Sequence, residues 1–432
     1  MDLHKIALEI RRAFLSPDLQ NLSLRNQALL AMAKNLQTAF PEIQKANEED
    51  LLDARKSDLA APLLKRLRFD EAKLHQVTQG LEDLARLPDP IGATTLAREL
   101  SPGLKLYRVT CPIGVIGVIF ESRPDALVQI ASLCLKSGNT VLLKGGREAM
   151  RTNACLTKIL QLSAEEVGLP GTFAQLLESR EDVQAMLSED TLIDLIIPRG
   201  SASFVQYIKD HSRIPVLGHA DGICHVYLDR DADPDTALKV ALDSKVQNVS
   251  VCNACETLLV HQDRAEELLP RLAEEYRKCG VTLRCTPDAA RYIPDSTPAT
   301  EDDWKTEYLD LILSVKVVSS LEEAIQHINT YGSHHTDCIV TENREAASIF
   351  LKQVDSAGVY VNVSTRFADG FVYGFGAEVG ISTGKIHARG PMGLDGLTTY
   401  KYKLIGSGQT MQSVRDGEIQ YTHRDLNEVC PL

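Results

Sequence analysis

The spacing of apolar residues changes near residue 100 of this chain. Before that point apolar positions recur every three to four residues, which is the period of an amphipathic helix. Examples are Ile6, Ile10 and Phe14, followed by Leu24, Ala28, Met32 and Leu36. Polar turns at 16–18 and 56–58 separate these predicted helices. Residues 104–109 then alternate and 115–120 form a short apolar run, which predicts an exposed strand followed by a buried one.

From residue 115 onwards predicted strands and helices alternate, as a parallel sheet with crossover helices requires. In a first series the strands are 140–143, 192–197, 214–217 and 225–228, and the helices are 125–136 and 202–211. In a second series the helices are 233–245, 265–279 and 324–329, and the strands are 257–260, 311–318, 338–341 and 359–362. Ser320 and Glu323 have the spacing of a capping box before the last helix. We therefore predict two doubly wound α/β halves with a boundary near residues 219–230.

Composition narrows the class of protein. The chain has 432 residues, of which 44% are hydrophobic and 24% charged, so it is neither collagen-like nor disordered. Its net charge of −13 argues against binding nucleic acid. No apolar run has the length of a secretory signal or a membrane span, so we predict a cytoplasmic protein without membrane contact. Its ten Cys are then expected to be reduced.

A Cys-x-x-Cys pair, Cys252 and Cys255, is one candidate for chemistry. No second pair of this spacing supports a zinc site, and the pair does not begin a βαβ unit as a thioredoxin-like dithiol would. Small polar residues precede Cys252 and a strand follows it, so a turn there can present the sulfur and backbone N–H groups. On local sequence alone, Cys252 is either a catalytic nucleophile or a buried structural thiol.

Other segments can hold anions, although the usual phosphate-binding fingerprints are absent. The glycines at 374, 376 and 380 have one residue too many for G-x-G-x-x-G, and Gly384-Lys385 lacks the P-loop Ser or Thr. Lys144-Gly145-Gly146-Arg147 follows a predicted strand and can hold a nucleotide, or it is an ordinary turn. Arg123 also follows a strand, where a surface salt bridge is the alternative. His387 and Arg389 lie in a glycine-rich loop that either binds an anion or has no such role.

Taken together, these segments resemble the gamma-glutamyl phosphate reductase family of the aldehyde dehydrogenase superfamily. The similarity spans nearly the whole chain. Its hallmarks are Phe120-Glu-Ser-Arg-Pro-Asp, Leu135-Lys-Ser-Gly-Asn, Lys144-Gly-Gly, Pro198-Arg-Gly, His219-Ala-Asp-Gly-Ile-Cys-His, Val251-Cys-Asn-Ala, Gly376-Ala-Glu-Val-Gly, Arg389-Gly-Pro-Met-Gly and the long segment 324–339. The resemblance implies an aldehyde-dehydrogenase-like α/β fold with two doubly wound domains and a small β-flap.

The resemblance also assigns roles to residues. Cys252 is implied as the nucleophile, with Asn253 near the oxyanion. The implied cofactor-binding residues are Lys144, Gly145, Gly146, Arg147, Gly200, Ser201 and Glu307, with Lys144 on the adenosine ribose and Glu307 on the nicotinamide ribose. A cation at Arg147 would accept a 2′-phosphate, so the expected cofactor is NADPH. Arg123, His387 and Arg389 are candidates for holding the substrate's phosphate, and no metal is expected.

The implied reaction is reduction of L-glutamyl 5-phosphate to L-glutamate 5-semialdehyde through a Cys252 thioester, the second step of proline biosynthesis. Hydrolytic relatives have a Glu-Leu-Gly-Gly segment where residues 216–222 read Val-Leu-Gly-His-Ala-Asp-Gly, so the water-activating carboxylate is missing. Rival interpretations are a hydrolytic or coenzyme-A-acylating aldehyde dehydrogenase and a non-catalytic scaffold. The upstream glutamate 5-kinase is a candidate partner.

The expected domains follow from the same resemblance. Residues 1–100 and 112–220 form the N-terminal helices and the NADP-binding domain, and residues 221–395 form the catalytic domain. Residues 101–111 and 396–420 form an oligomerisation flap, because Tyr400, Tyr402 and Leu404 alternate with polar residues as in a strand with one dry face. We expect a homodimer or a dimer of dimers, with an intramolecular edge hairpin as the alternative.

Overall fold

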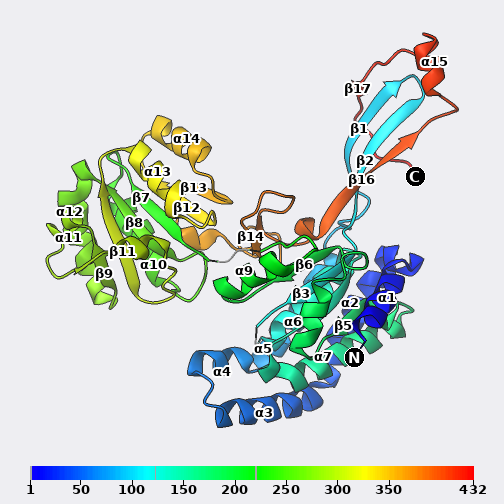
Figure 1. Cartoon of the computed structure of the whole chain (residues 1–432), viewed down its shortest axis with the longest axis horizontal. Coiled ribbons are helices and arrows are strands. Elements are labelled where there is room, and N and C mark those ends of the chain that lie inside the picture. The colour runs from blue at the N-terminus through cyan, green and yellow to red at the C-terminus, as the bar shows by residue number, and fades with distance from the viewer. Residues whose placement is uncertain (1, 122, 219–220) are drawn as a thin grey trace.

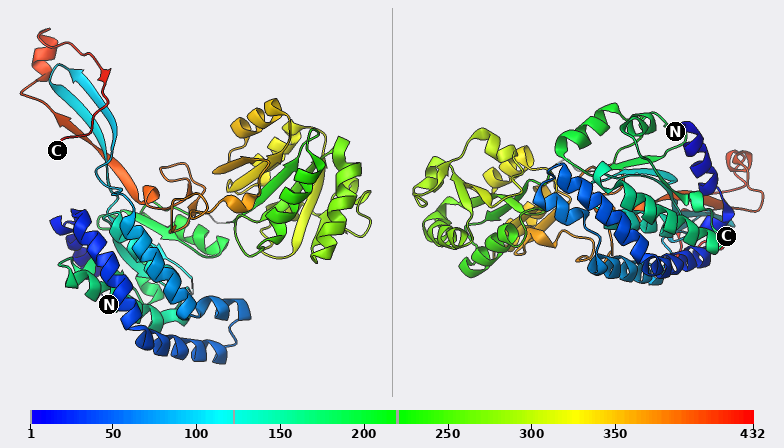
Figure 2. Two further views of the ribbon diagram at one scale, coloured as in Figure 1. Left: turned by 180° about the vertical axis from the view of Figure 1, so that it is seen from behind. Right: turned by 90° about the horizontal axis from the view of Figure 1, so that it is seen from below.

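A computed structural model describes residues 2–432 except 122 and 219–220. The chain forms two α/β lobes, each around its own sheet, and a separate antiparallel flap (Figure 1). The N-terminus lies on the first lobe and the C-terminus beside the flap. The rear view in Figure 2 shows the flap projecting away from both lobes. The predicted architecture of two α/β units with a β-flap is therefore confirmed.

The first lobe contains the predicted N-terminal helices and a four-stranded parallel sheet of order β5-β4-β3-β6. Its helices are α1 (Leu3–Phe14), α2 (Leu22–Thr38), α3 (Phe40–Lys56), α4 (Ala61–Leu67), α5 (Glu71–Arg86), α6 (Pro124–Lys136), α7 (Met150–Glu166), α8 (Arg180–Met186) and α9 (Ala202–His211). Its strands are β3 (Val115–Ile119), β4 (Thr140–Lys144), β5 (Ala174–Leu176) and β6 (Leu195–Pro198). Every residue of β3 and β4 is buried, which explains their continuous apolar sequences.

One predicted strand of the first lobe does not form. Residues 214–217 make a single parallel bridge, between Val216 and Ile196. The Ile196 N–H donates to the Pro215 carbonyl, and the Leu217 N–H donates to the Ile196 carbonyl. Pro215 has no N–H of its own, so the ladder cannot extend through it.

The second lobe has a seven-stranded parallel sheet of order β10-β9-β11-β8-β7-β12-β13. Its strands are β7 (Cys224–Leu228), β8 (Cys255–His261), β9 (Thr282–Cys285), β10 (Thr297–Pro298), β11 (Ile312–Val318), β12 (Thr336–Val340) and β13 (Gly358–Val361). Its helices are α10 (Pro234–Val246), α11 (Gln262–Lys278), α12 (Pro287–Ala290), α13 (Leu321–Tyr331) and α14 (Arg344–Gln353). The sequence analysis ended the first half with 225–228, but β7 pairs with β8 and β12 and belongs to this second sheet.

The capping of α13 differs in one detail from the predicted capping box. The Ser320 side chain accepts a hydrogen bond from the Glu323 N–H, as expected. The Glu323 carboxylate, however, accepts from the N–H and hydroxyl of Ser319, one residue earlier than in a capping box.

The flap is a four-stranded antiparallel sheet of order β16-β2-β1-β17, wider than the sequence predicted. Its strands are β1 (Thr94–Ser101), β2 (Leu104–Pro112), β16 (Thr398–Ile405) and β17 (Arg424–Asp425). A turn at Gly103, whose φ is +76°, pairs β1 with β2. Residues 94–100, which the sequence analysis assigned to the first domain, therefore belong to the flap. Tyr400, Tyr402 and Leu404 of β16 are exposed in the single chain.

Shorter elements connect these units. They are the 3-10 helices η1 (Pro17–Gln20), η2 (Arg147–Ala149), η3 (Gly171–Phe173), η4 (Glu301–Lys305), η5 (Thr365–Phe367) and η6 (Asp395–Leu397), the two-stranded pair β14 (Ile381–Ser382) and β15 (Gly390–Pro391), and α15 (Met411–Arg415). Among the helices that the structure describes, none is long and apolar enough to cross a lipid bilayer.

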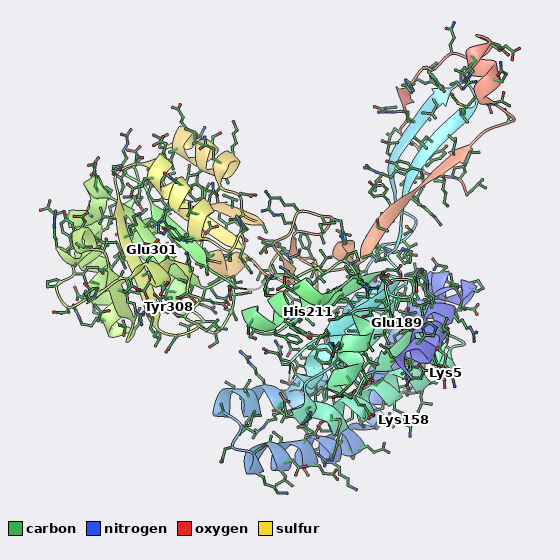
Figure 3. The ribbon with its side chains drawn as sticks, viewed as in Figure 1. Lys5, Lys158, Glu189, His211, Glu301 and Tyr308 are labelled. Carbon is green, nitrogen blue, oxygen red and sulfur yellow. The ribbon has the colours of Figure 1, made fainter. Side chains whose placement is uncertain are left out.

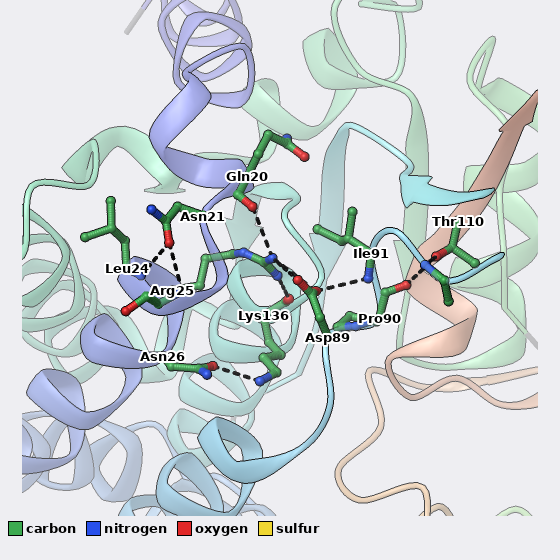
Figure 4. Close-up of polar contacts among 12 residues, drawn as sticks. Gln20, Asn21, Leu24, Arg25, Asn26, Asp89, Pro90, Ile91, Thr110 and Lys136 are labelled. Carbon is green, nitrogen blue, oxygen red and sulfur yellow. Dashed lines mark hydrogen bonds and ion pairs between the residues drawn. The ribbon is translucent and has the colours of Figure 1, made fainter. Parts of the chain in front are cut away.

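A buried polar network fixes the root of the flap on the first lobe (Figure 4). Arg25 of α2 is fully buried and forms an ion pair with Asp89 at 2.9 Å. Asp89 also accepts from the Ile91 N–H at 3.0 Å, just before β1 begins. The Lys136 ammonium of α6 donates to Asn26 at 2.8 Å and to the Leu87 carbonyl at 2.7 Å. These bonds tie the chain that leads into β1 to α2 and α6.

Candidate functional site

The site lies where an edge of one sheet meets an edge of the other. Gly222, Cys252, Glu307 and His335 precede β7, β8, β11 and β12, which are adjacent in the order β11-β8-β7-β12. Amino ends of neighbouring parallel strands share one sheet edge, so these four residues converge. Arg123 and Arg199 follow β3 and β6, at the carboxyl edge of the first sheet, where α/β proteins bind ligands.

A pocket of about 540 Å³ lies between these two edges. Of the residues predicted from sequence, it brings together Cys252, Asn253, Glu307, Gly200 and Arg123. Arg199 and Glu378 also line this pocket, and neither was singled out from the sequence.

Cys252 is half-buried, and its sulfur lies 3.2 Å from Nε2 of His335. His335 is 1% exposed, and its Nδ1 lies 2.9 Å from the Thr336 hydroxyl. Burial, together with the negative charges of Glu307 and Glu378, raises the pKa of Cys252 to about 12, although the charge of Arg199 opposes the shift. The thiol therefore keeps its proton at neutral pH.

Close packing holds the backbone of the Cys252 loop. A Cβ on Gly222 would overlap the Cys252 carbonyl group and Cα, so only glycine fits there. The Cys224 thiol donates to the Cys252 carbonyl at 3.3 Å, and the Thr365 hydroxyl donates to the Asn253 carbonyl at 2.7 Å. The Asn253 amide donates to the Ala368 carbonyl at 2.9 Å. The Asn253 side-chain amide is therefore bonded to the 364–368 segment in this structure.

Cys255 is a structural thiol. It is the first residue of β8, it is fully buried, and its thiol donates to the Thr257 carbonyl at 3.2 Å. Burial raises its pKa to about 12. No set of three or more His, Cys, Asp or Glu side chains gathers as metal ligands within the described part of the chain.

Arg199 is a cation that the sequence analysis did not single out, although it quoted Pro198-Arg-Gly. Its backbone N–H donates to the Ile119 carbonyl at 2.7 Å, which fixes it between the ends of β3 and β6. Burial and the charge of Arg123 lower its pKa, whereas Glu378 and Cys252 raise it. No described carboxylate forms an ion pair with Arg199, whereas Arg123 is paired with Asp125 at 3.0 Å. The rule that drew attention to Arg123, a cation directly after a buried strand, applies equally to Arg199.

Two carboxylates share the pocket. Burial raises the pKa of Glu307, and a hydrogen bond from the Gly222 N–H opposes that shift. Burial and Asp369 raise the pKa of Glu378 to about 7, against the opposing charge of Arg199. Each carboxylate lies close enough to influence the Cys252 sulfur by charge.

A buried ion pair supports both the Cys252 loop and the Glu307 segment. Lys245 of α10 donates to Glu256 at 2.5 Å, and both side chains are almost fully buried. The other Glu256 oxygen accepts from the Leu309 N–H at 3.3 Å. Burial raises the pKa of Glu256 to about 7 although Lys245 opposes the shift. Tyr308, labelled with Glu301 in the second lobe in Figure 3, lies over the Lys245 ammonium at 5.9 Å.

The predicted cofactor residues Lys144, Gly145, Gly146 and Arg147 line a separate small hollow at the end of β4. The buried Lys144 ammonium donates to the Gly145 carbonyl at 2.6 Å. A Cβ on Gly145 would overlap the Asn153 amide, and the Asn153 Oδ1 is buried without a hydrogen-bond partner among the described groups. Arg147 is exposed and makes no ion pair with a described residue. An orphaned acceptor beside two cations fits a ribose and phosphate.

Three predicted residues lie outside both hollows. Ser201 precedes α9, with its hydroxyl 3.2 Å from that of Ser203. Arg389 forms an ion pair with Asp355 at 3.0 Å, beside the Lys385–Asp355 pair. His387 lies 3.4 Å from the Gly396 carbonyl and is exposed. The structure therefore does not bring His387 or Arg389 into the pocket with Cys252, because Asp355 holds their loop elsewhere.

Comparisons with known proteins agree with this arrangement. The aldehyde dehydrogenase family model matches residues 33–289. The gamma-glutamyl phosphate reductase of Acetivibrio thermocellus is 56% identical over the full length of both chains. The crystal structure of the enzyme of that name from Thermotoga maritima is 39% identical, has a TM-score of 0.93, and covers 95% of this chain and all of its own. An acetylating aldehyde dehydrogenase from Geobacillus thermoglucosidasius, at 16% identity and a TM-score of 0.64 over 95% of this chain and 97% of its own, shares the fold.

Two parallel α/β lobes that meet at a pocket with a cysteine define the aldehyde dehydrogenase fold. Within it, the chain belongs to the gamma-glutamyl phosphate reductase family and is an oxidoreductase.

Proposed function

We propose that the chain catalyses NADPH-dependent reduction of L-glutamyl 5-phosphate to L-glutamate 5-semialdehyde and inorganic phosphate, the second step of proline biosynthesis. The names of its relatives support this substrate. The observation that carries the proposal is the single pocket that joins Cys252 and Glu307 of the second lobe to Arg123 and Arg199 of the first. A nucleophile, an anion site and a carboxylate suited to a ribose are the groups that this reaction needs.

Cys252 attacks the acyl carbon, expels phosphate and holds the acyl group as a thioester. The backbone N–H of Cys252 stabilises the tetrahedral oxyanion, and one such donor contributes about 3 kcal/mol in other enzymes. Asn253 joins it only when its amide leaves the Ala368 carbonyl.

Arg199 and Arg123 hold the phosphate. Arg199 has no described ion-pair partner, so its whole positive charge can attract a bound anion. Arg123 already shares its charge with Asp125. His387 and Arg389 join this role only if their loop leaves Asp355. Replacing Arg199 by Gln should raise the KM for acyl phosphate at least about tenfold, and Arg199→Lys should recover part of that loss. An unchanged KM in Arg199→Gln contradicts the assignment.

A bound nicotinamide cofactor supplies the hydride that reduces the acyl group. Glu307 and Gly200, which line the pocket, would hold its nicotinamide half, and Lys144, Gly145, Gly146 and Arg147 at the end of β4 would hold its adenosine half. Ser201, which follows Gly200, would contact its diphosphate. The exposed Arg147, without an ion-pair partner among the described residues, favours the 2′-phosphate of NADPH.

The missing water-activating carboxylate supports a reductase. Of its segment, residues 219–220 lie outside the described part of the chain, and the neighbouring Gly218 lines the pocket. Without that carboxylate the thioester survives until it is reduced. Phosphate dependence separates the possibilities. Oxidation of glutamate semialdehyde with NADP should require inorganic phosphate, whereas a hydrolytic enzyme needs none and an acylating one needs coenzyme A.

The direct test follows NADPH consumption with acyl phosphate generated by a glutamate 5-kinase. The native chain should turn over, and Cys252→Ala should lose reduction while it still binds NADPH. The matched control is Cys255→Ala, which removes a buried thiol outside the pocket and should keep activity if the variant folds. Near-normal turnover in Cys252→Ala would contradict the proposal.

The remaining expectations concern assembly. We propose that β16 pairs two chains, because it is an edge strand with Tyr400, Tyr402 and Leu404 exposed. Light scattering should give a dimer or a dimer of dimers. In Tyr402→Lys the added charge should favour the monomer, and an unchanged mass would contradict the role of this edge. The upstream kinase and a cytoplasmic location remain predictions.

A further inference from the structure

We propose that His335 is the catalytic base that takes the thiol proton of Cys252 as the sulfur attacks. The inference rests on the proposed function for the identity of the substrate, but not for the pairing of the two side chains. Nucleophile and base lie within hydrogen-bond reach, at 3.2 Å, and a third group orients the base.

The hydrogen bonds of the imidazole define which nitrogen receives the proton. Nδ1 lies 2.9 Å from the Thr336 hydroxyl, and the tautomer in which Nδ1–H donates to that hydroxyl directs the Nε2 lone pair towards the sulfur. We infer this tautomer from the partners. The neutral imidazole then accepts the S–H proton directly.

The backbone around His335 keeps the imidazole in place. The Gly358 N–H donates to the His335 carbonyl at 2.9 Å, and β12 begins at the next residue, paired with β7 on one side and β13 on the other. His334 has a φ of +60°, a conformation that non-glycine residues rarely adopt, and its Nδ1 lies 2.6 Å from the Asp355 carbonyl. Strain of this kind collects at functional sites, where neighbouring contacts enforce it.

The surroundings of the sulfur make a base necessary. Burial and two carboxylates disfavour a free thiolate, so the proton must leave as the sulfur–carbon bond forms. Glu307 and Glu378 influence the sulfur through their charges, which oppose ionisation. His335 offers the proton an imidazole nitrogen in hydrogen-bond contact with the sulfur.

The protons balance over one turnover. As the sulfur bonds to the acyl carbon, its proton moves to Nε2 of His335. The carbon–oxygen bond to phosphate then breaks, and the imidazolium returns its proton to the departing group, which leaves as the dianion. After reduction, the carbon–sulfur bond breaks and the thiolate takes one proton from solvent through His335, so each turnover consumes one proton.

The test measures the reactivity of Cys252 without substrate or cofactor. Iodoacetamide at about pH 8 alkylates the native chain and His335→Gln, and mass spectrometry of the peptides gives a rate for each cysteine. Gln keeps the size of the side chain but cannot accept a proton. The rate at Cys252 should fall at least about tenfold, whereas the exposed Cys279 should react at the same rate in both proteins.

His334→Asn is the matched control, because it removes the adjacent imidazole and Asn tolerates a positive φ. It should leave the Cys252 rate unchanged. In turnover, His335→Gln should lower kcat about 100-fold or more with little change in the KM for acyl phosphate. An equal Cys252 rate in native and His335→Gln chains overturns the assignment.

A second pair of variants covers the case in which His335→Gln does not fold. Thr336→Val keeps the imidazole but removes the partner of its Nδ1, and Thr336→Ser keeps that hydroxyl. Alkylation of Cys252 should slow several-fold in Thr336→Val and recover in Thr336→Ser. Equal rates in both would contradict the role of the pairing. Because alkylation needs no substrate, failure of the proposed reaction in the native chain would leave this result intact.

Discussion

Replacing Gly222 by Ala perturbs the nucleophile without touching its side chain. Gly222 precedes β7 and lies against the backbone of the Cys252 loop, which precedes the neighbouring β8. An added Cβ would lie 2.5 Å from the carbonyl carbon of Cys252 and would overlap its Cα and carbonyl oxygen. These are backbone atoms, so no side-chain rotation can relieve the clash.

The size of the effect follows from that overlap. Ordinary contact begins at 3.4 Å and the carbonyl oxygen is the nearest clashing atom, so the Cys252 backbone must retreat by more than 1 Å. A displacement of about 1 Å at a reacting centre lowers the rate about 100-fold. Overpacking of this kind also costs about 1–3 kcal/mol of folding stability. The Cys252–His335 contact would change together with the backbone, because the sulfur moves with its own Cα.

The assay compares Gly222→Ala with Gly80→Ala. Gly80 lies within α5 and a Cβ there meets nothing within 4 Å, so the control should keep full activity and gain up to about 1 kcal/mol. For Gly222→Ala, kcat for acyl-phosphate reduction should fall about 100-fold while NADPH binding, measured by fluorescence, remains. Native kcat in a folded Gly222→Ala chain would refute the packing argument.

Three further predictions concern the cofactor and stability. Arg147→Glu should weaken NADPH binding more than NADH binding, because only NADPH has a 2′-phosphate; equal losses by titration would remove this argument. Burial acts to raise the pKa of Asp303, but hydrogen bonds from Thr300, Tyr308 and Arg284 lower it to about 2. Its stabilisation, about 2 kcal/mol, is therefore complete above about pH 5 and is lost as the pH falls through about 2. Acid denaturation of Asp303→Asn should therefore show a smaller loss of stability over this range. Arg25→Met should lower folding stability by about 3 kcal/mol, because it breaks a buried ion pair and leaves Asp89 without its cation. Arg86→Met removes only exposed ion pairs and should change stability by less than about 1 kcal/mol. Equal effects of the two substitutions would contradict the role of burial.

Apolar spacing predicted most elements because it reflects burial. The helix at 202–211 matches α9 to the residue, and 257–260 and 338–341 fall on β8 and β12 to within a few residues. The strand prediction for residues 214–217 was wrong, because an apolar run that contains a proline can be buried without joining a β-ladder. The flap was underestimated because spacing does not reveal that β1 folds back at Gly103.

The candidate site was only partly predictable for a similar reason. Arg123 and Lys144 were singled out because they follow predicted strands, a rule that suits the first lobe. In the second lobe the candidate residues precede their strands, and only the strand order reveals that segments as distant as 252 and 335 meet. His335 was visible in a quoted motif, but nothing local in the sequence distinguishes it from His334. The 3.2 Å contact with Cys252 makes that distinction.

The proposed nucleophile and the proposed anion site lie on different lobes, and this separation affects the ionisation of the Cys252 thiol. Burial and the carboxylates of Glu307 and Glu378 keep the Cys252 sulfur protonated, and a protonated thiol resists oxidation. Arg199, from the first lobe, is the opposing charge. In the proposed reaction the anionic substrate binds to that cation and brings its acyl carbon to the sulfur, so deprotonation is needed only when an electrophile is present. A high thiol pKa is thus compatible with a reactive cysteine, provided that a base is already in contact with it, as proposed for His335.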